Sequence, residues 1–389
     1  MKKLLFIFLS LFLFLFTNSC KKAEVSNTST CTNASTTSHP KGFELQGFID
    51  SYVKQGIPGI SLLVGDSNGV WYGAAGKADL ENNITYAPCM VQKLGSITKM
   101  MMGVMVMKLV EEGTLHLDDK VSKWLDAKLI KDIVNADQVT LRNCLQHTTG
   151  IYDLITNSDF YLAVLHNPNK HWTGEELLPF VRNQTPMFAA NTGVKYSNTN
   201  FLLLSLCIEK ITGKSHSDLL HEKVFTPLKM NDTYYHTHDA LPSITAQGYF
   251  DLYNKKTLSN VSNVVTGSGN GYTGVYSNVF DLQKFLMGVF INKSVISSAS
   301  LNEMMQWKKD QGSEHTDFGL GIFRINADQG DALRIGHTGG DLGYASEVYY
   351  FPKTNRYYVI NVNYGTNGDS FLKPTYLQMV KELADLVRK

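Results

Sequence analysis

Strand-like segments near both ends of the chain constrain the fold most. Residues 59–65 (GISLLVG) form an apolar run, and a short turn joins them to a second strand over 70–75. Far along the chain, residues 345–351 and 357–363 predict two further strands joined by a turn. Because a sheet needs several strands to bury an apolar face, the two distant pairs are expected to share one antiparallel sheet.

Helical patterns flank and separate these strands. Apolar residues recur at helical spacing over 42–54, and a final helix is predicted over about 375–388. The intervening stretch 117–230 has a mainly helical pattern. The sequence therefore predicts an α+β fold, an antiparallel sheet flanked by N- and C-terminal helices, with 42–116 and 231–389 forming the sheet domain. Residues 117–230 are expected to form an inserted, mainly helical domain, and the active site is expected between the two.

The N-terminal segment predicts export. Two lysines precede the apolar run 4–16, and small residues lead to Cys20, so residues 1–19 are expected to be a signal peptide. The segment resembles a bacterial lipoprotein signal, which implies a lipid on Cys20. Residues 20–41, rich in Ser, Thr and Asn, would then form a lipid-anchored flexible tether to a periplasmic or cell-surface protein. A plain signal peptide with an incidental cysteine is the alternative.

Charge and cysteine content exclude some classes. With 36 basic and 35 acidic residues, the chain has no basic block that would favour nucleic-acid binding. Cys89, Cys144 and Cys207 show no CxxC spacing, so they predict neither a metal site nor an evident disulfide framework. Each is expected to be a small buried side chain.

Ser96 and Lys99 form a Ser-x-x-Lys motif at the start of a strongly apolar helical run. Positions i and i+3 share a helix face, so the hydroxyl and the amine can meet. A serine hydroxyl needs a neighbour that accepts its proton, and a buried lysine with a lowered pKa can do so. An ordinary helix N-cap serine is the competing interpretation. The spacing alone is weak, because it also occurs at Ser19, Ser38, Ser51 and Ser370.

Two further segments carry candidate groups. Tyr196-Ser197-Asn198 follows a loop and precedes an apolar helix. A tyrosine and a lysine can exchange protons during a reaction, and the Asn198 amide can both donate and accept hydrogen bonds. A second copy at 276–278 instead predicts a helix cap. His337-Thr338-Gly339-Gly340 lies on a predicted strand, where adjacent glycines let a ligand approach the backbone. The alternatives are a packed loop tyrosine and a Gly-rich turn with an exposed histidine.

Taken together and in this order, the motifs resemble those of the serine β-lactamase and penicillin-recognising family, in the branch of class C β-lactamases and D-Ala-D-Ala carboxypeptidases. The similarity rests on LGSITKMMMGVMVMKLVEEGTLHLDDKV, VTLRNCLQHTTGIYD, YSNTNFLLLSLCIEKITGK, GYTGVYSNVFDLQKFL and HTGGDLGYASEVYYFP, and it spans residues 42–388. It implies the β-lactamase/transpeptidase-like fold and an acyl-enzyme mechanism on amide or ester bonds.

The resemblance also implies roles for single residues. Ser96 would be the nucleophile, and Lys99 and Tyr196 its acid–base partners. Asn198 would orient the substrate amide, His337, Thr338 and Gly339 would form the third motif, and Gly340 would complete an oxyanion hole together with Ser96. His147, in the LQHTTGIYD segment, is interpreted as structural.

The third motif departs from the β-lactamases of this branch, which usually carry Lys where His337 stands. A partly charged imidazole near neutral pH would hold a β-lactam carboxylate less firmly. A D-Ala-D-Ala carboxypeptidase, D-peptidase or esterase is therefore the leading hypothesis; a true β-lactamase and a non-catalytic penicillin-binding or regulatory lipoprotein are the alternatives. No metal or cofactor is expected, and the expected partners are a small-molecule or peptide substrate and, through the anchor, a membrane.

Overall fold

The main sheet unites strands from the two ends of the body, as the sequence predicts. The computed structural model describes residues 38–243, 245–310, 313, 316–366 and 368–389, so Cys20, the signal segment 1–19 and most of the tether 20–41 lie outside the described residues. β1 (Gly59–Asp66) pairs antiparallel with its hairpin partner β2 (Gly69–Asp79) on one side and with β14 (Arg356–Val362) on the other.

The sheet then continues away from β14 through antiparallel neighbours. In the described residues it has nine strands, in the order β3-β2-β1-β14-β13-β12-β11-β10-β9. The remaining bounds are β3 (Ile84–Thr85), β9 (Lys308–Lys309), β10 (Thr316–Phe318), β11 (Phe323–Ile325), β12 (Arg334–Asp341) and β13 (Tyr344–Phe351). Strand β12, which carries the His-Thr-Gly-Gly segment, therefore lies inside the sheet beside β13.

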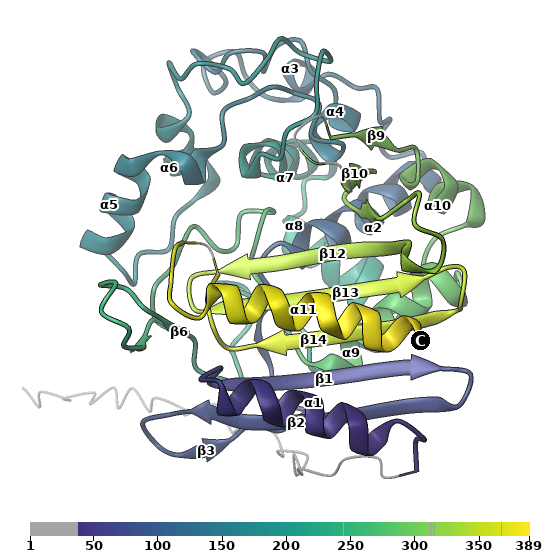
Figure 1. The fold of residues 1–389 in the computed structure, drawn as a ribbon. Helices are drawn as coiled ribbons and strands as arrows, with labels where there is room; N and C mark the ends of the chain where they lie inside the picture. Colours follow the sequence, from purple (N-terminus) through teal and green to yellow (C-terminus); the bar gives the residue numbers. More distant parts are fainter. Residues whose placement is uncertain (1–37, 244, 311–312, 314–315, 367) are drawn as a thin grey trace, which may run out of the picture. The chain divides into compact units, whose positions relative to one another are not determined.

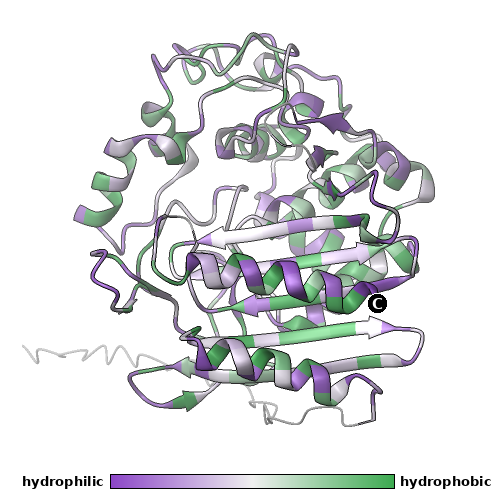
Figure 2. Ribbon diagram, viewed as in Figure 1, coloured by the Kyte–Doolittle hydropathy of each residue, from purple (hydrophilic) through white to green (hydrophobic). Residues whose placement is uncertain are grey.

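Helices cover both faces of this sheet. The terminal helices α1 (Gly42–Lys54) and α11 (Lys373–Arg388) lie over one face in Figure 1 and share a hydrophobic cluster with it. Figure 2 shows hydrophilic and hydrophobic residues alternating along α11, as expected for a helix with one buried stripe. Helices α2 (Ile97–Glu111) and α9 (Val279–Leu286) pack on the other face.

Helix α2 is buried all round rather than on one stripe. Its residues 97–107 are all buried, and three consecutive methionines contribute to its side chains. A helix that is apolar on every side is stable only inside a core. This burial places Lys99, in the first turn of α2, in surroundings with no access to water.

The stretch 117–230 contains less regular helix than its pattern predicts. Only α7 (Asn198–Thr212) is long; the other bounds are α3 (Val121–Trp124), α4 (Leu141–Leu145), α5 (Ser158–His166), α6 (Gly174–Leu177) and α8 (His216–Leu220), with the single-turn segments Leu154–Thr156, Leu178–Phe180 and η3 (His221–Phe225). Turns occupy much of the stretch between the short helices, and some of them contain asparagines with positive φ, such as Asn135 and Asn183. This stretch and the sheet share one continuous hydrophobic cluster, so their division into two domains stays a prediction.

The remaining elements are short. A small sheet joins β4 (Gln92–Lys93), β8 (Val275–Ser277) and β5 (Tyr234–Tyr235), and a two-stranded one joins β6 (Tyr249–Phe250) and β7 (Ser259–Asn260). After α9 follow the π turn Met287–Ile291, α10 (Ser298–Met304) and the turn Gly330–Ala332. Asn278 caps α9 through its side chain, which confirms the cap predicted for the second Tyr-Ser-Asn copy.

Two further findings concern the cysteines and the membrane. Cys144 and Cys207 are free and buried, as expected, but Cys89 is disulfide-bonded, so the expectation of no disulfide framework was wrong at that position. Spacing could not reveal this bond, because a disulfide partner need not be near in sequence. Among the described helices, none has the length and apolar character needed to cross a bilayer.

Candidate active site

Ser96 stands at the N-terminus of α2, directly against the backbone of β12. Gly95 precedes it in the left-handed region, at φ +57°. A Cβ at Gly95 would lie only 2.6–2.7 Å from the backbone of Gly340. On the neighbouring position, a Cβ at Gly339 would lie 1.9 Å from the carbonyl oxygen of Leu94. Glycine at both places therefore allows β12 to run beside the start of α2.

Ser96 contacts both predicted acid–base partners. The Lys99 Nζ lies 2.9 Å from Ser96 Oγ, and the Tyr196 hydroxyl donates to the same oxygen at 2.7 Å. These are ordinary hydrogen-bond distances, so an amine and a phenol, from Lys99 and Tyr196, converge on the Ser96 oxygen. The predicted nucleophile thus has two immediate neighbours that can exchange protons with it.

Lys99 is held by two further acceptors. Its Nζ donates to Asn198 Oδ1 at 2.8 Å and to the backbone oxygen of Tyr272 at 2.7 Å. Burial lowers the pKa of Lys99 to about 7 and outweighs the opposing attraction of Asp153 and Asp341. Near neutral pH the amine therefore exists in both protonation states. In its neutral form it can keep two donated bonds and turn its lone pair toward Ser96.

Tyr196 is a neutral phenol in this environment. Burial raises its pKa, the hydrogen bond to Ser96 opposes that rise, and the charge of Asp153 adds to it. Desolvation is the largest of these three effects. Tyr196 is thus a proton donor in the resting site. Its ring lies 4.4 Å from the ring of His147, which packs behind it.

Asp153 is a buried residue that the motif search missed. Its Oδ1 accepts the backbone N–H of Asn198 at 2.9 Å, and its two oxygens lie 3.2 and 3.1 Å from Asn198 Nδ2. This contact fixes the amide orientation, since the nitrogen faces Asp153 and the oxygen faces Lys99. The residue ends the quoted segment LQHTTGIYD, but one carboxylate after a loop carries no spacing signal of its own.

His147 supports the same region from behind. Its Nδ1 lies 3.2 Å from the backbone N–H of Ser197 and 3.1 Å from Asn200 Nδ2. Because both neighbours are donors, Nδ1 acts as the acceptor and Nε2 carries the proton. Burial and the nearby Lys99 charge lower the pKa of His147, so it is neutral at pH 7. These contacts hold the turn that presents Tyr196 and Asn198, in agreement with the structural role expected for it.

His337 does not carry the partial charge that the sequence argument gave it. The side chain is buried, it stacks on Phe323 with ring centres 4.0 Å apart, and its Nδ1 contacts the backbone oxygen of Thr338. Burial and the Lys99 charge lower its pKa to about 3, so the imidazole is neutral at pH 7. The expectation failed because the sequence does not show that Phe323 and Tyr196 enclose this position.

The rest of the third motif is divided between the two faces of β12. Strand alternation puts Thr338 on the face opposite His337 and Gly339. Gly340 borders the hollow at Ser96, together with Asn198 and Asp341. Ser96 and Gly340 thus border one space, so the prediction that their backbone N–H groups form an oxyanion hole stays open. Tyr161, Thr266 and Thr273 also border this hollow and had not been singled out from the sequence.

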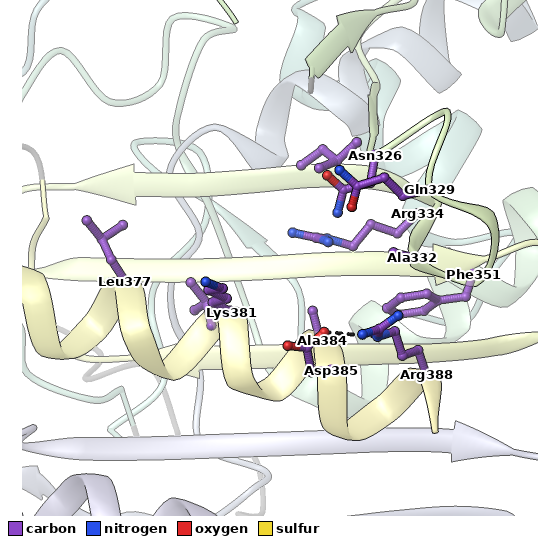
Figure 3. Close-up of a pocket in the computed structure, with 12 residues that line it drawn as sticks. Asn326, Gln329, Ala332, Arg334, Phe351, Leu377, Lys381, Ala384, Asp385 and Arg388 are labelled. Carbon is purple, nitrogen blue, oxygen red and sulfur yellow. Dashed lines mark hydrogen bonds and ion pairs between the residues drawn. The ribbon is translucent and has the colours of Figure 1, made fainter. Parts of the chain in front are cut away.

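A larger hollow lies elsewhere. It measures about 590 Å³ and runs along α11 beside β12, where Arg334, Lys381 and Arg388 line it (Figure 3). Arg388 donates to Asp385 there at 2.9 Å. None of its lining residues among the described ones is a predicted catalytic residue, so volume does not identify the candidate site in this fold.

Comparison with known proteins gives one consistent result. The beta-lactamase family model matches residues 45–380. D-alanyl-D-alanine-carboxypeptidase/endopeptidase AmpH of Escherichia coli (strain K12) is 26% identical over 329 residues, which cover 84% of this chain and 77% of that protein. Penicillin-binding protein 4* of Bacillus subtilis (strain 168) is 26% identical over 65% of this chain, and the match spans 56% of its own length.

A solved structure agrees with this result. A D-stereospecific amidohydrolase from Streptomyces sp. superimposes with a TM-score of 0.77 at 26% identity, over 89% of this chain and 98% of that one. The family model covers far more than half of the chain, and the motifs lie within the matched residues. The chain therefore belongs to the beta-lactamase family and is a serine hydrolase with the β-lactamase/transpeptidase fold.

Proposed function

We propose that this protein hydrolyses amide or ester bonds of D-amino-acid substrates through an acyl-enzyme on Ser96. One observation carries the proposal: Ser96 Oγ lies within hydrogen-bond distance of both Lys99 Nζ and the Tyr196 hydroxyl. The names of the relatives support the substrate class, since they include a D-alanyl-D-alanine-carboxypeptidase/endopeptidase and a D-stereospecific amidohydrolase.

The contacts suggest how the protons move. Neutral Lys99 takes the Ser96 proton as Oγ attacks the substrate carbonyl, and the N–H groups of Ser96 and Gly340 stabilise the resulting oxyanion. Tyr196 gives its proton to the departing amine or alkoxide. The Lys99 ammonium then passes the proton that it took from Ser96 to the Tyr196 phenolate, so both residues end the step neutral. In deacylation neutral Lys99 takes a proton from the attacking water, and Tyr196 gives its proton to Ser96 Oγ as the acyl bond breaks. The Lys99 ammonium then reprotonates the Tyr196 phenolate, which restores the resting site.

The charge around Ser96 favours some substrates over others. Among the described residues that border the hollow, none is a cation, and Asp341 is a carboxylate held by Thr266 and Thr273. The nearest ammonium groups are already engaged: Lys93 Nζ lies 3.8 Å from Asp341 Oδ2, and Lys99 Nζ contacts Ser96 and Asn198. Neutral His337 offers no positive charge either. A substrate with an anionic group beside the scissile bond, such as a β-lactam, therefore finds no partner for that charge. We rank uncharged D-amino-acid amides and esters above β-lactams on this ground.

Steady-state kinetics on a matched panel test the proposal. The panel contains a D-alanine anilide, its L-enantiomer, a D-Ala-D-Ala peptide, a p-nitrophenyl ester and nitrocefin, each assayed with wild type and Ser96→Ala. We expect the D-anilide to be hydrolysed faster than its L-enantiomer and Ser96→Ala to lose all activities. Nitrocefin turnover above that of every D-substrate would overturn the ranking. Full ester hydrolysis by Ser96→Ala would overturn the mechanism.

The export signal leads to a separate proposal. The charged, apolar and small-residue order before Cys20 supports an exported protein whose N-terminal cysteine carries lipid. Metabolic labelling with a clickable fatty acid in a bacterial host should mark the wild-type chain and leave Cys20→Ala unlabelled. Equal labelling of both chains would remove Cys20 from this role.

A further inference from the structure

Two histidines and an aspartate meet on the side of the protein formed by α8 and β5. His221 begins the π turn η3 directly after α8, whereas His238 and Asp239 follow β5. His221 Nε2 lies 2.8 Å from Asp239 Oδ2, and His238 Nδ1 lies 2.8 Å from Asp239 Oδ1. One donor atom from each residue lies within 4.8 Å of the others. Segments 17 residues apart therefore bring three metal-binding side chains to one point.

A fourth side chain takes the position of an outer-shell partner. His238 Nε2, the nitrogen that faces away from Asp239, lies 2.9 Å from Asp218 Oδ1. The other oxygen of Asp218 accepts the hydroxyl hydrogen of Ser215 at 2.6 Å, which fixes the carboxylate. Metal-binding histidines typically donate their second N–H to a carboxylate in this way, because the bond sets the tautomer and the ring orientation.

The remaining surroundings also suit a metal ion. Asp239 Oδ2 accepts the backbone N–H of Tyr235 at 2.6 Å, so the carboxylate is held independently of the histidines. A hollow of about 350 Å³ adjoins His221 and Asp239, and its lining mixes polar side chains such as Asn231 with apolar ones such as Phe225 and Met230. His238 is exposed, and the other two residues are half-buried. Solvent can thus reach the cluster and complete a coordination shell.

We propose that His221, His238 and Asp239 bind a Zn²⁺ ion, with Asp218 as the outer-shell partner of His238 and water in the fourth position. Two imidazoles and one carboxylate are donors that Zn²⁺ accepts in a four-coordinate site. Calcium and magnesium need more oxygen ligands than this cluster provides. Binding requires His221 Nε2 and His238 Nδ1 to carry no proton, so the ion takes the place of the hydrogens that now join them to Asp239.

The ion would join two segments beside the catalytic region. Tyr235, whose N–H holds Asp239, accepts the backbone N–H of Gly271 on its hydroxyl at 3.0 Å. The next residue, Tyr272, supplies the backbone oxygen that binds Lys99. Zinc bound here would link the α8–η3 turn to the segment after β5. This inference does not depend on the chemistry of Ser96.

Isothermal titration of the chelator-treated full chain with ZnCl₂ tests the site. We expect one ion per chain and a rise in melting temperature with added zinc. His221→Ala should weaken binding by roughly two orders of magnitude, and Asp218→Asn by about tenfold, in line with the loss of a ligand and of an outer-shell carboxylate. His166→Ala removes an exposed histidine outside the cluster and should bind zinc as wild type does.

A second measurement covers variants that fail to fold. Wild-type protein loaded with Co²⁺ should show the intense visible bands of a low-coordinate nitrogen and oxygen site, and ZnCl₂ should abolish them. Absence of a saturable one-to-one event in the wild type would overturn the proposal. Equal weakening by His166→Ala and His221→Ala would also overturn it, since binding would then be general surface adsorption.

Discussion

Replacing Lys99 by methionine should change how the stability of the protein depends on pH. Methionine keeps the length and volume of the side chain but carries no charge, so the variant removes one titrating group from the core. Burial holds the pKa of Lys99 at about 7 in the folded protein, against 10.5 for an ordinary lysine. Between these two values the unfolded chain carries a proton that the folded chain has released.

The sign and size of the effect follow from this difference. Because the unfolded state binds more protons, the stability of the wild type rises with pH across this range. The penalty for burying the ammonium is complete below pH 7 and is gone above pH 10.5. Each pH unit is worth about 1.4 kcal/mol, so the whole interval corresponds to about 5 kcal/mol. Between pH 7.5 and 9.5 the wild type should gain about 2–3 kcal/mol relative to Lys99→Met.

Urea denaturation of both proteins at several pH values in this window measures the effect. All other ionisable groups are present in both chains, so the difference between the two free energies of unfolding isolates Lys99. Methionine also leaves Asn198 Oδ1 and the Tyr272 oxygen without their donor, which lowers the stability of the variant by an amount that does not vary with pH. A difference that stays constant across the window would refute the argument that Lys99 is desolvated.

Three more predictions concern catalysis and packing. kcat/KM for an uncharged ester should rise with pH through about 7, because only neutral Lys99 accepts the serine proton; a rate independent of pH from 5.5 to 8.5 would contradict this. Asp153→Asn should lower kcat/KM by roughly 10- to 150-fold, because Asn198 loses the carboxylate that orients its amide. This range corresponds to about 1.5–3 kcal/mol, the contribution of a hydrogen bond to a charged group. A folded variant with wild-type kinetics would show that Asp153 does not orient Asn198 for catalysis. Gly95→Ala should abolish activity and lower the melting temperature, because its Cβ would meet β12 at 2.6–2.7 Å; Gly113→Ala, also at positive φ but with nothing within 4 Å, should cost only about 1 kcal/mol of backbone strain.

The spacing of apolar residues was enough to predict the bounds of the elements that bury one regular face. The helix predicted over 42–54 has those bounds in the structure, and the strand predicted over 59–65 ends one residue later, at Asp66. Both segments have a simple apolar spacing that matches one secondary structure. The short strands β9 to β11 were not predicted, because two or three residues do not establish a period. The helical content of 117–230 was overestimated, because many apolar residues there lie in turns and still pack into the core.

The candidate site was predictable where a motif carries the chemistry and unpredictable where burial decides it. Ser96, Lys99 and Tyr196 were found by spacing and resemblance, and the structure brings them together. The charge state of His337 and the part played by Asp153 depend on neighbours from distant segments. A single sequence shows neither the burial of His337 nor the hydrogen bond between Asp153 and Asn198, which are 45 residues apart. Both features become visible only once the chain is folded.

The central claim is that the Ser96 hydroxyl, activated by Lys99 and Tyr196, is the group that becomes acylated. Covalent labelling of the full chain with a fluorophosphonate, followed by peptide mass spectrometry, tests it most directly. We expect one adduct per chain, located on Ser96, and none on a folded Lys99→Met variant over the same time. An adduct on another serine, or equal labelling of a Ser96→Ala chain, would contradict it.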